Sequence, residues 1–153
     1  AISRTRTGGI VVEGTSGSTG ISLATLSTRR GHSIIIVMPD DQAQEKRTIL
    51  QCIGALVHVV PNVAISNPNH YVNVARRIAH DINTQSYASP NPPSSKKHDN
   101  NIIMALFTNQ FENESNFKIH YETTGPELWQ QTHSRMDAFC MSSGTGGTLA
   151  GVA

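Results

Sequence analysis

Apolar residues occur along this chain as short continuous runs and as longer stretches with helical spacing. Mostly apolar runs lie at 10–12, 34–38 and 56–60, and a proline follows each of the last two. Runs this short predict strands buried on both faces of a sheet. Apolar positions three and four apart predict helices over 21–30 and 69–81, with a further helix between the second and third runs. Strands that alternate with amphipathic helices indicate an α/β fold with a parallel sheet covered on both faces.

Glycine and polar residues mark the ends of the first two helices. Gly31 and Gly54 stand where C-terminal caps belong, and Asp41 is placed to cap the second helix. The spacing also predicts which helical positions face the sheet: Ile21, Ala24, Thr25 and Thr28; Ala43, Ile49, Leu50 and Ile53; and Ala75, Ile78, Ala79 and Ile82.

The second half of the chain is less regular. Residues 83–101 are rich in Ser, Asn, Pro and Lys and have no periodicity, which predicts an exposed loop, either a tolerated insertion or a functional lid. The pattern after it predicts two strands and two helices, with a break at Thr124-Gly125-Pro126 between the helices: strand 102–107, helix 112–121, helix 127–131 and buried strand 136–141. Phe117 and Trp129 are expected to anchor the core.

Composition excludes several classes of function. A net charge of +1 without a basic run gives no field that favours nucleic acid. The longest purely apolar run, five residues, is too short to span a membrane. Cys52 and Cys140 lie in apolar segments and are expected to be buried free thiols of a reducing compartment. The seven histidines have no ligand spacing, so no metal site is expected.

Two loops rich in glycine and hydroxyl groups carry the candidate chemistry. The first loop, Thr15-Ser16-Gly17-Ser18-Thr19-Gly20, lies between a predicted strand and a predicted helix, where backbone N–H groups point at an anion. A plain capped turn is the alternative. The second loop, Gly144-Thr145-Gly146-Gly147-Thr148, leaves the backbone free to fold around a phosphate. It lacks the lysine of a P-loop, and Leu149 replaces the third glycine of the dinucleotide fingerprint.

Together the two loops resemble those of pyridoxal-phosphate enzymes of fold type II, the cysteine synthase and cystathionine β-synthase group. Met38-Pro39, Asn109-Gln110-Phe111-Glu112-Asn113 and Thr124-Gly125-Pro126-Glu127 are similar to further family blocks and follow the family order. The sequence of residues 13–20, Glu-Gly-Thr-Ser-Gly-Ser-Thr-Gly, is similar to that of a fungal subgroup of cysteine synthase-like proteins. The resemblance implies a three-layer αβα fold like that of the tryptophan synthase β subunit, here incomplete. Residues 10–110 would form mostly the smaller domain, with a disordered loop at 84–101, and 111–153 the start of the larger cofactor domain.

The resemblance also implies roles for both loops. The first loop and Gln110 would bind the substrate α-carboxylate through Thr15, Ser16, Gly17, Thr19 and Gln110 itself. Ser18 stands where the family has an asparagine that reaches the cofactor ring, and being shorter it would need a water or a shifted ring. The cofactor phosphate would be held by Gly144, Thr145, Gly146, Gly147 and Thr148. Ser142 replaces a glycine that the family has just before this loop.

By resemblance the reaction is β-replacement on a small amino-acid substrate: O-acetylserine loses acetate, and sulfide adds at Cβ to give cysteine. A homodimer in the cytoplasm or mitochondria is expected for the parent enzyme. The family's Schiff-base lysine precedes the first loop, so this chain is expected to be an inactive fragment without it. The four lysines are expected to be solvated surface groups: Lys46, Lys96, Lys97 and Lys118. The alternatives are a non-catalytic relic or partner-binding fragment, and a lyase like cystathionine β-synthase or threonine dehydratase.

Overall fold

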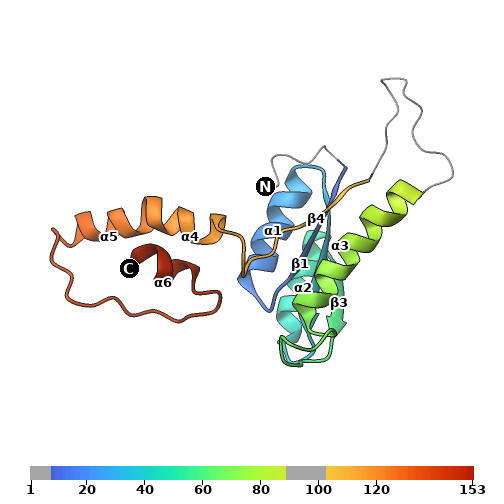
Figure 1. Cartoon of the computed structure of the whole chain (residues 1–153), viewed down its shortest axis with the longest axis horizontal. Coiled ribbons are helices and arrows are strands. Elements are labelled where there is room, and N and C mark those ends of the chain that lie inside the picture. The colour runs from blue at the N-terminus through green and yellow to red at the C-terminus, as the bar shows by residue number, and fades with distance from the viewer. Residues whose placement is uncertain (1–7, 89–102) are drawn as a thin grey trace, which may run out of the picture. The chain divides into compact units, whose positions relative to one another are not determined.

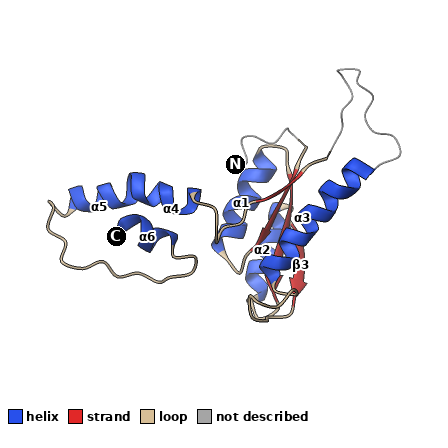
Figure 2. Ribbon diagram, viewed as in Figure 1, coloured by secondary structure: helices blue, strands red, loops and turns tan. Residues whose placement is uncertain are grey.

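A computed structural model describes residues 8–88 and 103–153 of the chain. These residues form two compact units that divide between Asn109 and Gln110. The first unit contains the sheet and the second contains short helices (Figure 2). No helix in the described ranges is both long enough and apolar enough to cross a membrane.

A four-stranded parallel sheet is the framework of the first unit. Its strands are β1 (Ile10–Gly14), β2 (Ser33–Pro39), β3 (Leu56–Val60) and β4 (Ala105–Phe107). They lie in the order β3-β2-β1-β4, with every neighbouring pair parallel. The three strands predicted from the first apolar runs are therefore present, and the predicted α/β class is confirmed.

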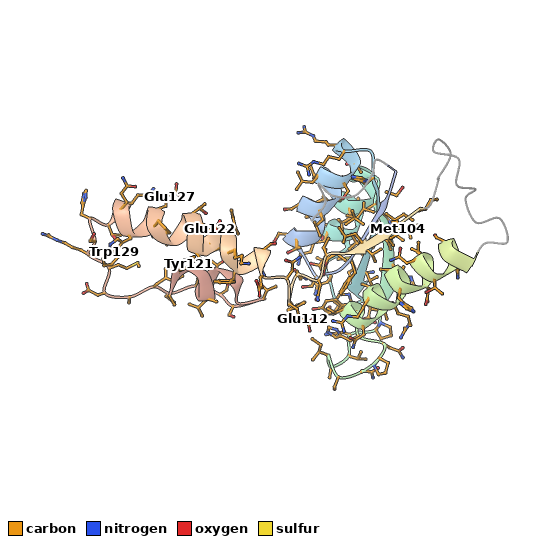
Figure 3. The ribbon with its side chains drawn as sticks, turned by 45° about the horizontal axis from the view of Figure 1, so that its top comes forward. Met104, Glu112, Tyr121, Glu122, Glu127 and Trp129 are labelled. Carbon is orange, nitrogen blue, oxygen red and sulfur yellow. The ribbon has the colours of Figure 1, made fainter. Side chains whose placement is uncertain are left out.

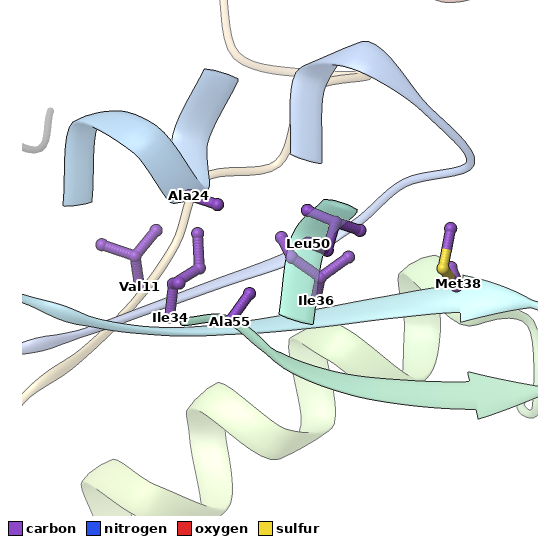
Figure 4. Packing of buried hydrophobic residues seen from close by; sticks show 7 residues of the cluster. All are labelled: Val11, Ala24, Ile34, Ile36, Met38, Leu50 and Ala55. Carbon is purple, nitrogen blue, oxygen red and sulfur yellow. The ribbon is translucent and has the colours of Figure 1, made fainter. Parts of the chain in front are cut away.

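Helices cover both faces of this sheet, as the continuous apolar strands require (Figure 1). On one face, α1 (Ser18–Arg29) and α2 (Gln44–Ile53) contribute Ala24 and Leu50 to a cluster that includes Ile34 and Ile36 of β2 (Figure 4). On the other face lies α3 (Tyr71–Ala88), whose buried residues pack with the opposite side chains of β1 and β2: Val74, Ala75 and Ala79 against Val12 and Val37.

The predicted inner faces are only partly right. The third helix is confirmed, since Ala75 and Ala79 are buried and its two isoleucines pack against them. In α1 and α2, however, several predicted inner positions are exposed: Thr25, Thr28, Ala43 and Ile49. Both threonines hydrogen-bond to the carbonyl four residues earlier, which satisfies them on the solvent side. Asp41 does not cap α2, because the N-cap position is Ala43 and no side chain caps it. Gly54 ends α2 in the left-handed region, as predicted.

The predicted loop at 83–101 begins too early. Helix α3 continues to Ala88, and residues 89–101 lie outside the described ranges. Asn83 holds the extended helix to the edge strand, because its amide donates to the Ala105 carbonyl at 3.0 Å and accepts from the Ala105 N–H at 2.7 Å. Ser86 adds a bond to the carbonyl of Ile103. Polar residues that suggested a loop thus satisfy the backbone at the edge of the sheet.

The second unit is built from helices alone. Its elements are α4 (Ser115–Ile119), the π-helical turn η2 (His120–Thr124), α5 (Gly125–Gln131) and α6 (Gly147–Val152). The first three follow one another without a gap, so the predicted break at 124–126 is wrong. Pro126 lies in the first turn of α5, where its missing N–H is tolerated, and the wide π turn precedes it.

Three further predictions are wrong. Residues 136–141 form no strand, because the second unit, which the structure describes completely, has no other strand to pair with them. Phe117 and Trp129 are 36% and 49% exposed instead of buried. Trp129 lies in the second unit (Figure 3). Cys52 and Cys140 are both free but exposed. The only buried residues of the second unit, all of which the structure describes, are two glycines, Gly147 and Gly151. This unit therefore contains no apolar core that could bury these side chains.

Candidate functional site

The first loop lies at the carboxyl end of the sheet, where the chain connections diverge. Strand β1 has β2 on one side and β4 on the other, and helices α1 and α2 cover the face opposite α3. The carboxyl ends of the strands are the usual location of ligand sites in open parallel sheets. The first loop follows β1, and Thr108 follows β4, so both lie at this edge.

A buried carboxylate joins these two strand ends. Glu13, fully buried at the end of β1, accepts a hydrogen bond from the hydroxyl of Thr108. The backbone N–H of Thr15 then donates to the carbonyl of Val37 on β2 at 2.9 Å. At Gly14 the start of α3 approaches so closely that an added Cβ would lie 2.7 Å from the Val72 Cα. The first loop therefore starts from a rigid position.

None of the hydroxyl groups of the first loop caps the helix that follows. Gly17 is the N-cap residue of α1, and no side chain makes a cap hydrogen bond there. The buried Thr15 hydroxyl instead accepts the Gly17 N–H within the turn, at 3.3 Å. Ser16 and Thr19 are half-buried and Ser18 is exposed. The plain capped turn, offered as the alternative from sequence, is therefore not what forms.

Lys46 approaches the first loop from α2. Its ammonium donates to the Ser16 carbonyl at 3.1 Å and to Oε1 of Gln42 at 2.9 Å. The same nitrogen lies 3.8 Å from the position that a Cβ on Gly17 would occupy. Lys46 is half-buried, so its assignment as a solvated surface lysine is wrong, whereas Lys118 is exposed and paired with Glu114 at 2.8 Å. Lys96 and Lys97 lie outside the described residues.

The second loop is folded around a left-handed glycine and is held by a neighbouring helix. Gly146 has φ 77° and precedes α6, in the backbone region that favours glycine. Asn116 donates to the Thr145 hydroxyl at 2.8 Å, and the Gly147 N–H approaches the same oxygen at 3.4 Å. The Thr148 hydroxyl lies 3.1 Å from Nε2 of His120.

A pocket of about 350 Å³ opens beside the second loop, entirely within the second unit. Its walls include Thr145, Gly146 and Gly147 together with Phe111 and Phe117. Glu112 and Glu114 also line it. The hydrogen bond from Lys118, then its charge, lower the pKa of Glu114, so this carboxylate stays ionised and paired with a cation at neutral pH.

Gln110, the other predicted part of the substrate site, is half-buried at the start of the second unit. Its backbone carbonyl accepts a hydrogen bond from Asn116 at 2.9 Å. The structure thus joins Gln110 to the second loop through one side chain. The first loop belongs to the other unit, and the prediction that both loops open onto one cleft stays a prediction.

Sequence reasoning missed three residues that hold these loops. Lys46 is expected to be solvated, Asn116 has no expected role, and His120 is weighed only as a metal ligand. For Lys46 no local signal exists, because its contact joins residues 30 positions apart. For the other two a signal exists: Asn116 and His120 are four residues apart, as are Gly147 and Gly151 opposite them.

In the described ranges, no group of three His, Cys, Asp or Glu side chains is arranged to hold a metal ion.

The sequence profile described as "Pyridoxal-phosphate dependent enzyme" matches residues 1–153. The chain belongs to this family of pyridoxal-phosphate enzymes.

Within that family, several similar curated proteins are cysteine synthases. Cysteine synthase 1 of Emericella nidulans is 45% identical over 95% of this chain, and cysteine synthase 1 of Neurospora crassa is 43% identical over the same share. Cysteine synthase of Dictyostelium discoideum is 37% identical over 95%. The chain spans 34%, 34% and 33% of these three proteins, respectively, or about a third of each.

A solved structure extends the likeness to the fold. A hydrogen sulfide-producing enzyme, crystallised with an α-aminoacrylate intermediate, superposes with a TM-score of 0.70 and 27% identity. The match covers 98% of this chain and 40% of that one. It confirms the predicted fold class, and membership in the family confirms the predicted cofactor.

Proposed function

We propose that this chain is part of an enzyme that makes cysteine from O-acetylserine and sulfide by β-replacement. The observation that carries the proposal is the similarity to three cysteine synthases over 95% of the chain. We also propose that the two units belong to the smaller and larger domains of the family. Pyridoxal 5′-phosphate, when bound, supplies the electron sink that allows bonds at Cα and Cβ to break.

The residues of the second loop fit the phosphate of this cofactor. Gly146 takes the left-handed conformation, and Gly147 has no room for a side chain because Asn116 packs against it. Thr145 is one of the residues that line the 350 Å³ pocket. We propose that Thr145, Thr148 and the backbone of the three glycines hold the phosphate, and that Ser18 contributes on the cofactor's ring side.

We propose that the first loop binds the substrate α-carboxylate through Thr15, Ser16, Gly17 and Thr19, with the amide of Gln110 as a further donor. Two observations support this. The first turn of α1 has no side-chain cap, which leaves N–H groups for an anion. The Lys46 ammonium on the Ser16 carbonyl adds positive charge behind the loop.

A ligand pair tests the carboxylate proposal. We expect O-acetylserine to shift the backbone amide signals of residues 16–20 in an NMR titration, and its methyl ester, which lacks the carboxylate, to leave them in place. The variant Ser16→Ala should weaken the affinity for O-acetylserine about tenfold, which is the effect of losing one hydrogen bond to a charged group. Ser22→Ala, at an exposed position of α1, is the matched control. Equal shifts from acid and ester would refute a carboxylate site.

We further propose that none of the chain's four lysines forms the Schiff base, so the 153 residues alone make no cysteine. Lys118 is paired with Glu114, and the Lys46 ammonium is engaged by two oxygens. Borohydride reduction of the chain with cofactor, followed by peptide mass spectrometry, should give no pyridoxyl-lysine. A single stoichiometric adduct on one lysine would contradict this.

A lyase reaction is the second candidate, because the similar solved structure is a sulfide-producing enzyme. We rank it lower, since that likeness rests on 27% identity against 45% for a cysteine synthase. In the whole enzyme, release of sulfide from cysteine without an acylated serine would favour the lyase. The homodimer and the cytoplasmic or mitochondrial compartment stay predictions.

A further inference from the structure

Two side chains, one helical turn apart, reach the two threonine hydroxyls of the second loop. Asn116 on α4 contacts Thr145 at 2.8 Å, and His120 at the start of η2 contacts Thr148 at 3.1 Å. All four residues belong to the second unit. The pair is therefore a feature of this unit alone.

Glycine spacing in α6 permits this contact. Gly147 and Gly151 are four residues apart, and both are buried against the α4–η2 segment. A Cβ at Gly147 would overlap the Asn116 amide, and one at Gly151 would lie 2.6 Å from the His120 Cβ. Because α6 approaches so closely, two short side chains suffice to reach the loop.

The hydrogen bonds at Thr145 leave the hydrogen of its hydroxyl group available to donate to a ligand. The side-chain amide of Asn116 donates one hydrogen to the Gln110 carbonyl at 2.9 Å and the other to the Thr145 oxygen. The Gly147 N–H approaches that oxygen too. Since the Thr145 oxygen already accepts, its own hydrogen is left to donate elsewhere.

Whether the Thr148 hydroxyl can donate to a ligand depends on the tautomer of His120. Nδ1 of His120 lies 3.0 Å from the Thr124 hydroxyl, and Nε2 faces Thr148. If Nδ1 carries the proton, Nε2 must accept the Thr148 hydrogen and the hydroxyl presents only lone pairs outward. If Nε2 carries it, Thr124 donates to Nδ1, His120 donates to Thr148, and Thr148 keeps its hydrogen for a ligand.

We propose that Asn116 and His120, the latter as its Nε2–H tautomer, are positioning residues that turn the Thr145 and Thr148 hydroxyls into phosphate donors. The inference rests on the proposed role of the second loop as the cofactor phosphate site. A phosphate dianion accepts hydrogen bonds only, so a loop with both hydroxyls presented as donors selects it. Each residue acts through a threonine and does not itself touch the phosphate.

The test compares pyridoxal 5′-phosphate with pyridoxal, which lacks the phosphate, as ligands of the full 153-residue chain. Asn116→Asp replaces the amide donor by an acceptor of the same shape, so Thr145 must donate to it. His120→Asn is too short to reach Thr148, whereas His120→Gln has an N–H at its tip. We expect the first two variants to weaken binding of the phosphate form about tenfold or more. Pyridoxal affinity should stay unchanged in all three, and His120→Gln should bind like the parent chain.

A direct readout on the parent chain needs no variant. Long-range ¹H–¹⁵N correlation of the His120 ring distinguishes the two tautomers, and Nε2 should carry the proton. An Nδ1–H ring, or variants that weaken both ligands equally, would overturn the inference. If the parent chain prefers the phosphate form and the variants keep that preference, only this inference fails. If the parent chain shows no preference, the proposed phosphate site fails with it.

Discussion

At the scale of single residues, the unexpected features are polar side chains that hold backbone turns. Thr15 and Lys46 hold the first loop, Asn116 and His120 hold the second, and His70 holds the start of α3. Each contact satisfies a backbone or hydroxyl group of the turn. Such contacts fix loop geometry more than they add stability.

His70 gives a pH dependence with a defined sign. Its Nδ1 accepts the Val72 N–H at 3.3 Å, which requires the unprotonated nitrogen, and burial lowers the pKa of His70. A lowered pKa means that the folded chain favours neutral His70, so this stabilisation is present above about pH 6.5 and is lost as the pH falls through the folded value. Urea unfolding should give a lower free energy of unfolding at pH 5.0 than at pH 7.5. His70→Asn, which keeps a side-chain acceptor, should reduce the loss, and an identical loss would refute the assignment.

Lys46 should stabilise the first loop more than a surface lysine does. Lys46→Met keeps the aliphatic stem but removes both hydrogen bonds of the ammonium, so we expect unfolding free energy to fall by about 1 kcal/mol. Amide hydrogen exchange at residues 16–19 should become faster. Lys118→Met removes only an exposed ion pair and should change stability by less than about 0.5 kcal/mol. Equal effects of the two substitutions would contradict the role given to Lys46.

At the scale of elements, the strands and α3 follow directly from the sequence, and the short helices do not. A strand buried on both faces needs a continuous apolar run, and β2 has one. The run that forms β3 contains His58, and this edge strand is mostly exposed, so its predicted burial on both faces is wrong. Residues 136–141 are also mostly apolar yet form no strand, because pairing depends on partners that no local pattern encodes. Likewise, Pro126 signals a break, but it falls in the first turn of α5, where proline is tolerated.

Gly14 tests how tightly β1 and α3 must pack below the first loop. In Gly14→Ala the new Cβ would meet the backbone at Val72 and Tyr71, at 2.7 and 2.8 Å, and backbone cannot move aside as a flexible side chain can. We expect a loss of about 1–3 kcal/mol in unfolding free energy. Gly17→Ala meets only the Lys46 ammonium, at 3.8 Å, and should change stability by about 0.5 kcal/mol or less. Wild-type stability in Gly14→Ala would disprove this close contact.

At the scale of the whole molecule, the sequence predicted the α/β class, the cofactor and the two loops, but not what holds those loops. The loops are recognisable because short motifs of glycine and hydroxyl residues are local. The residues that hold them come from other elements, as with Lys46 and Ser16, 30 positions apart. A cleft shared by the two loops stays a prediction, since the loops lie in different units.

The central claim is that both loops bind one substrate–cofactor pair. The stable compound N-(5′-phosphopyridoxyl)-L-serine carries the carboxylate and the phosphate in a single molecule. In an NMR titration of the chain, we expect the amides of residues 16–20 and 144–148 to shift together, with one midpoint and one molecule bound per chain. Binding should be tighter than for O-acetylserine or the cofactor alone, because the second contact is intramolecular. Shifts in one loop only, or saturation at two molecules per chain, would contradict the claim.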